Sequence, residues 1–114
     1  MNVEVAEKRP GVFVLAIEGE VDMSTSPEVR GALLPLFRKD ASHVIVDLSE
    51  VPYMDSSGIA TLVEGLQQAR KGNLRFTLAG TRPSVEAVFE LAYLKTVFEM
   101  VPGVDEALEG EGKA

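Results

Sequence analysis

A chain of 114 residues with 46% hydrophobic and 25% charged residues has the composition of one globular domain. Its formal net charge of −7 disfavours direct binding to nucleic acid or to an anionic membrane surface. The chain has no cysteine, its longest apolar run (residues 12–17) is too short to span a bilayer, and its N-terminus has no apolar leader. We therefore expect a cytoplasmic protein with neither a disulfide nor a thiolate metal site.

The first residues predict two antiparallel strands joined by a tight turn. Residues 3–7 alternate between apolar and polar side chains, which is typical of a half-buried strand. Pro10 and Gly11 then favour a turn, and residues 12–17 are apolar on both faces, as in a central strand. We therefore expect a hairpin whose second strand is the spine of a sheet.

A helix and a second buried strand are predicted next. Ser26 is expected to cap the helix, with Pro27 at its first position, and Pro35 to kink or shorten it. The apolar run at residues 44–48 predicts a buried strand. The single histidine, His43, precedes this run and has no second imidazole to share a metal, so we interpret it as structural or surface-exposed.

The second half of the chain predicts helices that alternate with strands. Residues 57–71 predict a helix that ends at Gly72 and Asn73, and a strand is expected at residues 75–79. A third helix follows, then a short last strand at residues 97–98 and a short helix at residues 104–108. The core positions of the two longer helices are expected to be Ile59, Leu62, Val63 and Leu66 in the first, and Val85, Val88, Phe89 and Ala92 in the second.

This order of elements predicts an α/β fold, with a mixed four- to five-stranded sheet flanked by helices. The later strands are expected to be parallel and joined by right-handed crossovers. We expect a single domain over residues 1–108. Residues 109–114 are rich in Gly and Glu and have too few apolar groups to order themselves, so they predict a disordered tail.

The segment Asp55-Ser56-Ser57-Gly58 carries the most distinctive chemistry of the chain. It follows a predicted buried strand, and the carboxyl ends of such strands carry the functional loops of α/β folds. Ser56 or Ser57 can cap the next helix, whose first turn favours an anion, and Gly58 would let the backbone approach that anion. A plain turn and helix cap would use the same residue types, so both interpretations stay open.

Catalysis by the chain itself has little support in the sequence. The chain lacks a Gly-x-Ser-x-Gly elbow and a Gly-x-x-x-x-Gly-Lys-[Ser/Thr] phosphate loop. His43 is expected at the opposite end of the strand that leads to the serines. Because a serine without an adjacent base needs another protein to phosphorylate it, we predict a modified switch rather than an enzyme, with no cofactor.

Two motifs resemble signatures of one protein family. Residues 53–60, Tyr-Met-Asp-Ser-Ser-Gly-Ile-Ala, resemble the phosphorylation motif of anti-sigma factor antagonists of the STAS domain family. Residues 19–25, Gly-Glu-Val-Asp-Met-Ser-Thr, resemble its second signature, and the resemblance in motif and element order extends over about residues 3–108. It implies that Ser56 is the phosphoacceptor, with Ser57 as the alternative. The residues that it implies for lining the site or binding a partner are Asp22, Thr25, Asp55, Ser57 and Gly58.

The resemblance also implies a regulatory cycle. The unphosphorylated chain would bind an anti-sigma factor that is also an ATP-dependent serine kinase, and this binding would free a sigma factor. Phosphorylation of Ser56 would end the binding, and a separate phosphatase would restore it. Roughly −1.5 to −2 added charges beside Asp22 and Asp55 would disfavour a partner surface that fits the neutral hydroxyl. Ser26 and residues 80–83 are further candidates for the border of this surface.

Two alternative functions stay open at the level of sequence. The STAS family includes cytoplasmic subunits of membrane transport complexes, lipid transporters among them, and the partner would then be a transporter ATPase. Residues 44–55 also resemble a receiver-domain strand that ends in a phosphorylated aspartate. Residues 17–20, however, lack the adjacent carboxylates that a receiver needs to hold Mg²⁺.

Overall fold

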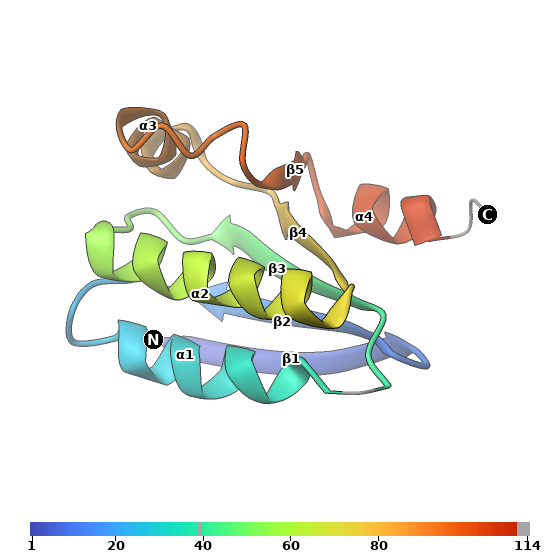
Figure 1. The fold of residues 1–114 in the computed structure, drawn as a ribbon. Helices are drawn as coiled ribbons and strands as arrows, with labels where there is room; N and C mark the ends of the chain where they lie inside the picture. Colours follow the sequence, from blue (N-terminus) through green and yellow to red (C-terminus); the bar gives the residue numbers. More distant parts are fainter. Residues whose placement is uncertain (39, 112–114) are drawn as a thin grey trace.

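The computed structural model describes residues 1–38 and 40–111, which form a five-stranded sheet with helices on both faces (Figure 1). The strands lie in the order β1-β2-β3-β4-β5 across the sheet. The predicted α/β fold with a mixed sheet is confirmed. In chain order the elements are β1 (Asn2–Arg9), β2 (Val12–Glu18), α1 (Ser26–Leu33), the 3₁₀ helix η1 (Leu34–Leu36), β3 (His43–Glu50), α2 (Ser56–Gly72), β4 (Arg75–Ala79), α3 (Pro83–Leu91), β5 (Glu99–Val101) and α4 (Val104–Glu111).

β1 and β2 form the predicted antiparallel hairpin. Gly11 makes its turn with a φ of 79°, and a Cβ added there would lie 2.7 Å from the backbone oxygen of Asp40. Along β1, Val3 is the one residue that is partly buried. The prediction of a half-buried strand is therefore wrong for most of β1, because an edge strand has a neighbour on one side only.

β2, β3, β4 and β5 run parallel to one another, as predicted. β2 is apolar on both faces, but the strand in the middle of the sheet is β3. Val44, Ile45 and Val46 of β3 are fully buried, because Val44 and Val46 pack into the apolar core on one face of the sheet and Ile45 into the core on the other. The spine of the sheet is thus β3, and the assignment of this role to residues 12–17 is wrong.

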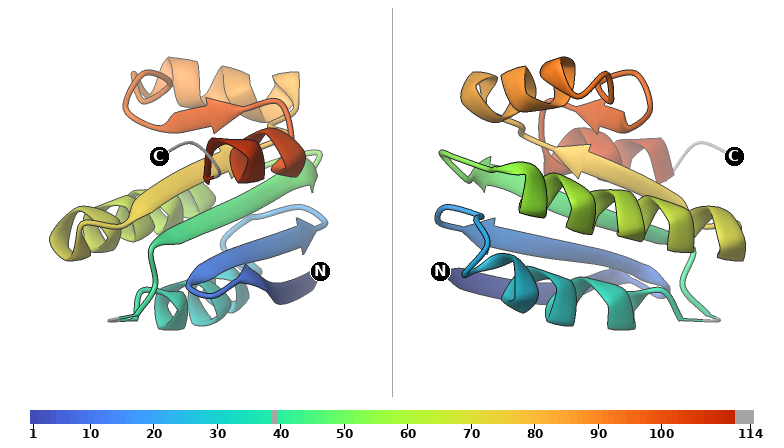
Figure 2. Two further views of the ribbon diagram at one scale, coloured as in Figure 1. Left: turned by 90° about the vertical axis from the view of Figure 1, so that its right-hand side faces the viewer. Right: turned by 60° about the vertical axis from the view of Figure 1, so that its left-hand side comes forward.

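The two faces of the sheet are covered unequally, as Figure 2 shows. Helices α1, α2 and α3 pack over the larger apolar core, and α4 packs over a smaller one on the other face. Side chains alternate along a strand, so Leu15 of β2 joins the larger core whereas Val14 joins the smaller one. Nη1 of Arg9 donates to the Leu108 carbonyl (3.2 Å), which connects the hairpin to the last turn of α4.

Helix α1 begins one residue earlier than predicted. Thr25 is the N-cap, whereas Ser26 is the first helical residue and is buried. The prediction that Ser26 caps the helix is wrong, because the amides of Thr25 and Ser26 both donate to the Asp22 carbonyl and a turn has therefore formed before Ser26. Pro35 acts as predicted, since α1 ends at Leu33 and the chain continues as η1.

Helix α2 buries a different stripe from the predicted one. Ile59 and Leu62 are buried as expected, but Val63 and Leu66 are only partly buried. Small residues fill the rest of the buried face, because they allow α2 to approach its neighbours closely. A Cβ on Gly65, for example, would lie 3.0 Å from Cδ2 of Leu33. The other small residues of this face are Gly58, Thr61 and Ala69.

The C-terminal elements are shifted or longer than predicted. Helix α3 buries Val85 and Phe89, but Ala92 is exposed beyond its end. Strand β5 lies at residues 99–101 rather than 97–98. Helix α4 continues to Glu111, so the start of the predicted tail is helical, and residues 112–114 lie outside the described residues. No helix in the described part of the chain is long and apolar enough to cross a membrane.

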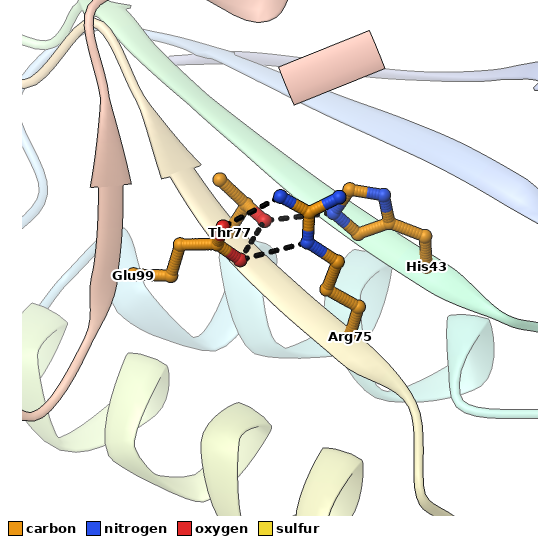
Figure 3. Close-up of polar contacts among 4 residues, drawn as sticks. All are labelled: His43, Arg75, Thr77 and Glu99. Carbon is orange, nitrogen blue, oxygen red and sulfur yellow. Dashed lines mark hydrogen bonds and ion pairs between the residues drawn. The ribbon is translucent and has the colours of Figure 1, made fainter. Parts of the chain in front are cut away.

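His43 belongs to a polar cluster on the α4 face of the sheet (Figure 3). The Thr77 hydroxyl donates to Glu99 (2.9 Å), so it must accept from Nε2 of His43 (2.7 Å), because a hydroxyl has one hydrogen and a carboxylate only accepts. Arg75 binds both oxygens of Glu99 (2.9 and 2.6 Å), and this hydrogen bonding is the main cause that lowers the Glu99 pKa. His43 is fully buried, so the structural alternative of its two predicted roles is confirmed.

We expect Leu62→Ala to lower the free energy of unfolding by about 2–5 kcal/mol, because the side chain is fully buried beneath α2 and its loss leaves a cavity. Leu91→Ala is the matched control, since Leu91 is 82% exposed, and should change the stability by less than about 0.5 kcal/mol. Urea denaturation of both variants measures the difference. Equal losses would contradict the described packing.

Candidate functional site

The two sequence motifs meet at the carboxyl ends of β2 and β3. The Val21 amide donates to the Tyr53 carbonyl (3.0 Å), and the Asp55 amide donates to the Val21 carbonyl (3.0 Å). Val21 and Met54 thereby form a parallel β-bridge beyond the ends of the strands. The motif around Asp22 and the motif around Ser56 are thus parts of one surface, which sequence spacing alone does not show.

Helix α2 rests directly on this bridge at Gly58. Val21 and Met54 are fully buried, and a Cβ on Gly58 would lie 2.8 Å from Cγ1 of Val21 and 2.5 Å from Cγ of Met54. Such distances are shorter than a real Cβ tolerates, so Gly58 is required for the packing of α2 on the loop. This packing is a reason for glycine that the sequence interpretation did not foresee, and the role predicted for Gly58, to let backbone approach an anion, stays a prediction.

Asp55 is the residue that caps α2. Its Oδ1 accepts from the Ser57 amide (2.9 Å) and from the Ser57 hydroxyl (2.6 Å), with an extended backbone at the N-cap position. The prediction that Ser56 or Ser57 caps the helix is therefore wrong, because both serines lie inside its first turn. The anion favoured at this helix start is supplied by the Asp55 carboxylate.

The two serines differ in their surroundings. Ser56 is exposed, and its hydroxyl makes no side-chain hydrogen bond within residues 1–38 and 40–111. Ser57 is partly buried, and its hydroxyl is held by Asp55. Ser56 is accordingly the more accessible hydroxyl.

Asp22 orders the loop between β2 and α1. Its Oδ1 accepts from the Ser24 amide (2.9 Å), the Ser24 hydroxyl (2.7 Å) and the Thr25 amide (3.1 Å). The Thr25 hydroxyl accepts from the Asp22 amide (2.9 Å) and donates to the Glu20 carbonyl (2.9 Å). Asp22 and Thr25 therefore shape the loop that the Val21 bridge places beside Ser56.

Both carboxylates of the site have pKa values below the ordinary aspartate value. Hydrogen bonding from the Ser24 hydroxyl is the largest cause for Asp22, and hydrogen bonding from the Ser57 hydroxyl is the largest for Asp55. The negative charge of Asp22 raises the Asp55 pKa in part, because the two carboxylates repel each other. Asp55, next to Ser56 in the chain, and the nearby Asp22 are therefore both negatively charged at neutral pH.

The border of the site includes Arg82, from the predicted border loop at residues 80–83, and also Met23, Tyr53 and Ser84, which the sequence interpretation did not single out. Met23 and Tyr53 expose large side chains, 80% and 48% respectively. Nε of Arg82 donates to the Ser49 carbonyl (2.9 Å), and the Ser84 hydroxyl donates to the Pro52 carbonyl (2.8 Å).

Residues 80–83, the loop after β4, were predicted as part of this border. Residues 80–83 follow β4, and the carboxyl ends of parallel strands lie at one edge of the sheet. Ser26, the other border candidate, is only 8% exposed and therefore offers little surface to a partner.

The site can accept a modification, and it holds little catalytic machinery. His43 lies at the entering end of β3, opposite the serines. No group of three or more His, Cys, Asp or Glu side chains in the described ranges could hold a metal ion. The arrangement offers one exposed hydroxyl at a helix start, flanked by two carboxylates.

Comparison with known proteins identifies the family. The STAS domain profile matches residues 5–107, so the chain belongs to the STAS domain family. It is 28% identical over 100 residues to the anti-sigma-B factor antagonist of Listeria monocytogenes, with 88% of each chain covered. Membership of the STAS family excludes the receiver-domain alternative. The antiparallel β1–β2 pair agrees with the mixed sheet that the resemblance to this family implied.

Solved structures agree with this fold. An anti-sigma factor antagonist from Mycobacterium paratuberculosis superposes with a TM-score of 0.84 at 27% identity, over 96% of this chain and 92% of that one. The anti-sigma factor antagonist SpoIIAA in its unphosphorylated form superposes with a TM-score of 0.84 at 18% identity, over 99% of this chain and 98% of that one.

The lowered pKa values of Asp22 and Asp55 predict a pH dependence of stability. A carboxylate whose pKa is lower in the folded chain stabilises the fold above its unfolded pKa, and this contribution is lost as the pH falls through the folded value. We therefore expect Asp22→Asn and Asp55→Asn to be less stable than wild type at pH 7, with the difference shrinking as the pH falls below about 4.

Urea denaturation at pH 7 and pH 3 measures this difference. Glu4→Gln serves as the control, because Glu4 is exposed on β1 and makes no side-chain hydrogen bond among the described residues. A stability difference that is the same at both pH values would show that these aspartates do not act through their charge.

Proposed function

We propose that this chain is a cytoplasmic anti-sigma factor antagonist that is controlled by phosphorylation of Ser56. The observation that carries the proposal is the exposed Ser56 hydroxyl in the first turn of α2, beside the Asp55 cap, in a chain of the STAS family. The antagonist relatives from Listeria and Mycobacterium support the same role. The chain then acts as a binding switch.

Ser56 is preferred over Ser57 as the phosphoacceptor for a geometric reason. A kinase must place the hydroxyl in line with the γ-phosphate of ATP, so the hydroxyl has to be accessible. Ser56 is exposed, whereas modification of Ser57 would break its 2.6 Å hydrogen bond to Asp55 and remove part of the helix cap.

The charge change explains how phosphorylation would end binding. A phosphate on Ser56 adds roughly −1.5 to −2 charges where Asp55 already occupies the Ser57 amide. Asp22, across the Val21–Met54 bridge, adds to the negative potential. A partner surface that fits the neutral hydroxyl would then face a concentrated negative charge, and a like-charge or uncompensated contact weakens binding.

The proposed partners follow from this switch. An anti-sigma factor binds the unphosphorylated chain and releases its sigma factor, and the same anti-sigma factor phosphorylates Ser56 with ATP. A separate phosphatase removes the phosphate and restores binding. The chain contributes the hydroxyl, the cap and the charges, and the kinase contributes the phosphoryl-transfer machinery.

We expect the purified anti-sigma factor of the same organism, incubated with Mg²⁺ and ATP, to add one phosphate to the wild-type chain and to Ser57→Ala. Ser56→Ala should remain unmodified while still binding the anti-sigma factor, because the loss of one exposed hydroxyl leaves the cap intact. Intact-mass spectrometry and isothermal titration calorimetry measure the two properties.

The other outcomes are equally informative. Phosphate retained in Ser56→Ala and lost in Ser57→Ala would assign the acceptor to Ser57. Absence of binding by the wild-type chain, together with co-purification with a transporter ATPase, would favour the transport-subunit alternative.

A further inference from the structure

The C-terminal end of α3 carries a residue that its own backbone disfavours. The Leu94 amide donates to the Phe89 carbonyl (2.9 Å), and the Tyr93 amide donates to the Glu90 carbonyl (3.0 Å). These two hydrogen bonds define a Schellman motif, with Tyr93 at the left-handed position (φ 59°). Glycine is the favoured residue at this position, because a Cβ is strained there.

Packing within the chain does not compensate for this strain. Tyr93 is 90% exposed, and Leu91, two residues before it, is 82% exposed. A large aromatic ring at a glycine position that contacts little of its own chain lowers stability and exposes apolar surface. These two costs suggest that the side chains contact another molecule.

Leu91 lies on an exposed face of α3 that starts beside the phosphorylation loop, and Tyr93 follows just beyond the C-terminal end of this helix. Ser84, at the beginning of α3, donates to the Pro52 carbonyl, and Tyr53 follows in the loop toward Ser56. Positions 84, 87 and 91 lie on one face of the helix, because they are spaced by three and four residues. All three are exposed, and about 10 Å of helix separates Ser84 from Leu91. Figure 1 shows α3 beside the loop that joins β3 to α2.

We propose that Ala87, Leu91 and Tyr93, here called the α3 ridge, form a second contact surface for the anti-sigma factor. The proposal rests on the function proposed above and extends its binding surface away from Ser56. The ridge carries no charge, so phosphorylation of Ser56 leaves it unchanged. Ser56 then decides whether the partner binds, and the ridge supplies affinity through apolar contact.

Charge favours this partner over a second copy of the chain. The chain carries a net charge of −7, so two copies repel each other. Glu86 and Glu90 flank the ridge and share Lys95 (2.7 and 3.0 Å), which leaves the border acidic. The ridge therefore fits an apolar groove with basic side chains at its rim.

The test uses the full-length chain and the purified anti-sigma factor of the same organism. We expect Tyr93→Gly to raise the melting temperature by roughly 4 °C, because it relieves the strain, and to weaken binding about tenfold. Leu91→Ala should also weaken binding severalfold without loss of stability, and Tyr93→Phe should bind like wild type. Val5→Ala is the control, because Val5 is exposed (47%) on β1 at the opposite edge of the sheet.

A merely structural role for Tyr93 predicts the reverse pattern, in which Tyr93→Gly lowers the melting temperature. If Tyr93→Gly and Leu91→Ala bind like wild type while Ser56→Asp binds weakly, the ridge proposal fails and the proposed function stands. If the wild-type chain does not bind the anti-sigma factor, both proposals fail. Two chains per complex through the ridge, detected by light scattering, would assign the surface to self-association instead.

Discussion

The parallel bridge between Val21 and Met54 is the interaction on which the site depends. It extends the pairing of β2 and β3 past the ends of the strands and joins two loops that are distant in sequence. Both residues are fully buried, and Gly58 allows α2 to pack directly on them. The bridge therefore fixes how the first turn of α2 packs against the loops, and so it fixes the position of Asp55 and the two serines.

Asp55 gives this framework its electrostatic character. As the N-cap, it occupies the position at which a helix start would bind an anion from outside. A phosphate on Ser56 would arrive beside an anion that is already hydrogen-bonded to the Ser57 amide. The expected result is a large change in surface charge with little change in the core, because Ser56 is exposed and Val21, Met54 and Gly58 lie beneath it. A switch of this kind alters binding and leaves the fold intact.

The fold was predictable to the extent that long apolar patterns determine it. The hairpin, β3, α2 and β4 follow directly from apolar runs and turn residues. The predictions were less accurate where small residues or long-range contacts decide the structure. Gly58 and Gly65 are buried because of the neighbours they face, and a hydrophobic period does not detect them. The composition of residues 109–114 suggested disorder, but α4 extends to Glu111. Earlier in the same helix, Ala107 and Leu108 pack on the sheet.

The candidate site was predictable in its members but not in their roles. The bridge brings together the two segments that hold these members, as the motif resemblance suggested. One is the loop with Asp22 and Thr25, and the other is Asp55 with the first turn of α2, which holds Ser56, Ser57 and Gly58. The cap belongs to Asp55 rather than to a serine, because Ser, Thr and Asp are all good caps and only the backbone geometry decides among them. Tyr93 could not be singled out from sequence, since its significance depends on a positive φ.

In the proposed switch, charge at Ser56 controls binding without altering the fold. Calorimetric titration of the anti-sigma factor with the chain phosphorylated at Ser56, and with the same preparation after dephosphorylation, tests it most directly. We expect the phosphorylated chain to bind at least about a hundredfold more weakly, while both forms give the same far-ultraviolet circular dichroism spectrum. Equal affinity of the two forms would contradict it, as would weaker binding accompanied by loss of secondary structure.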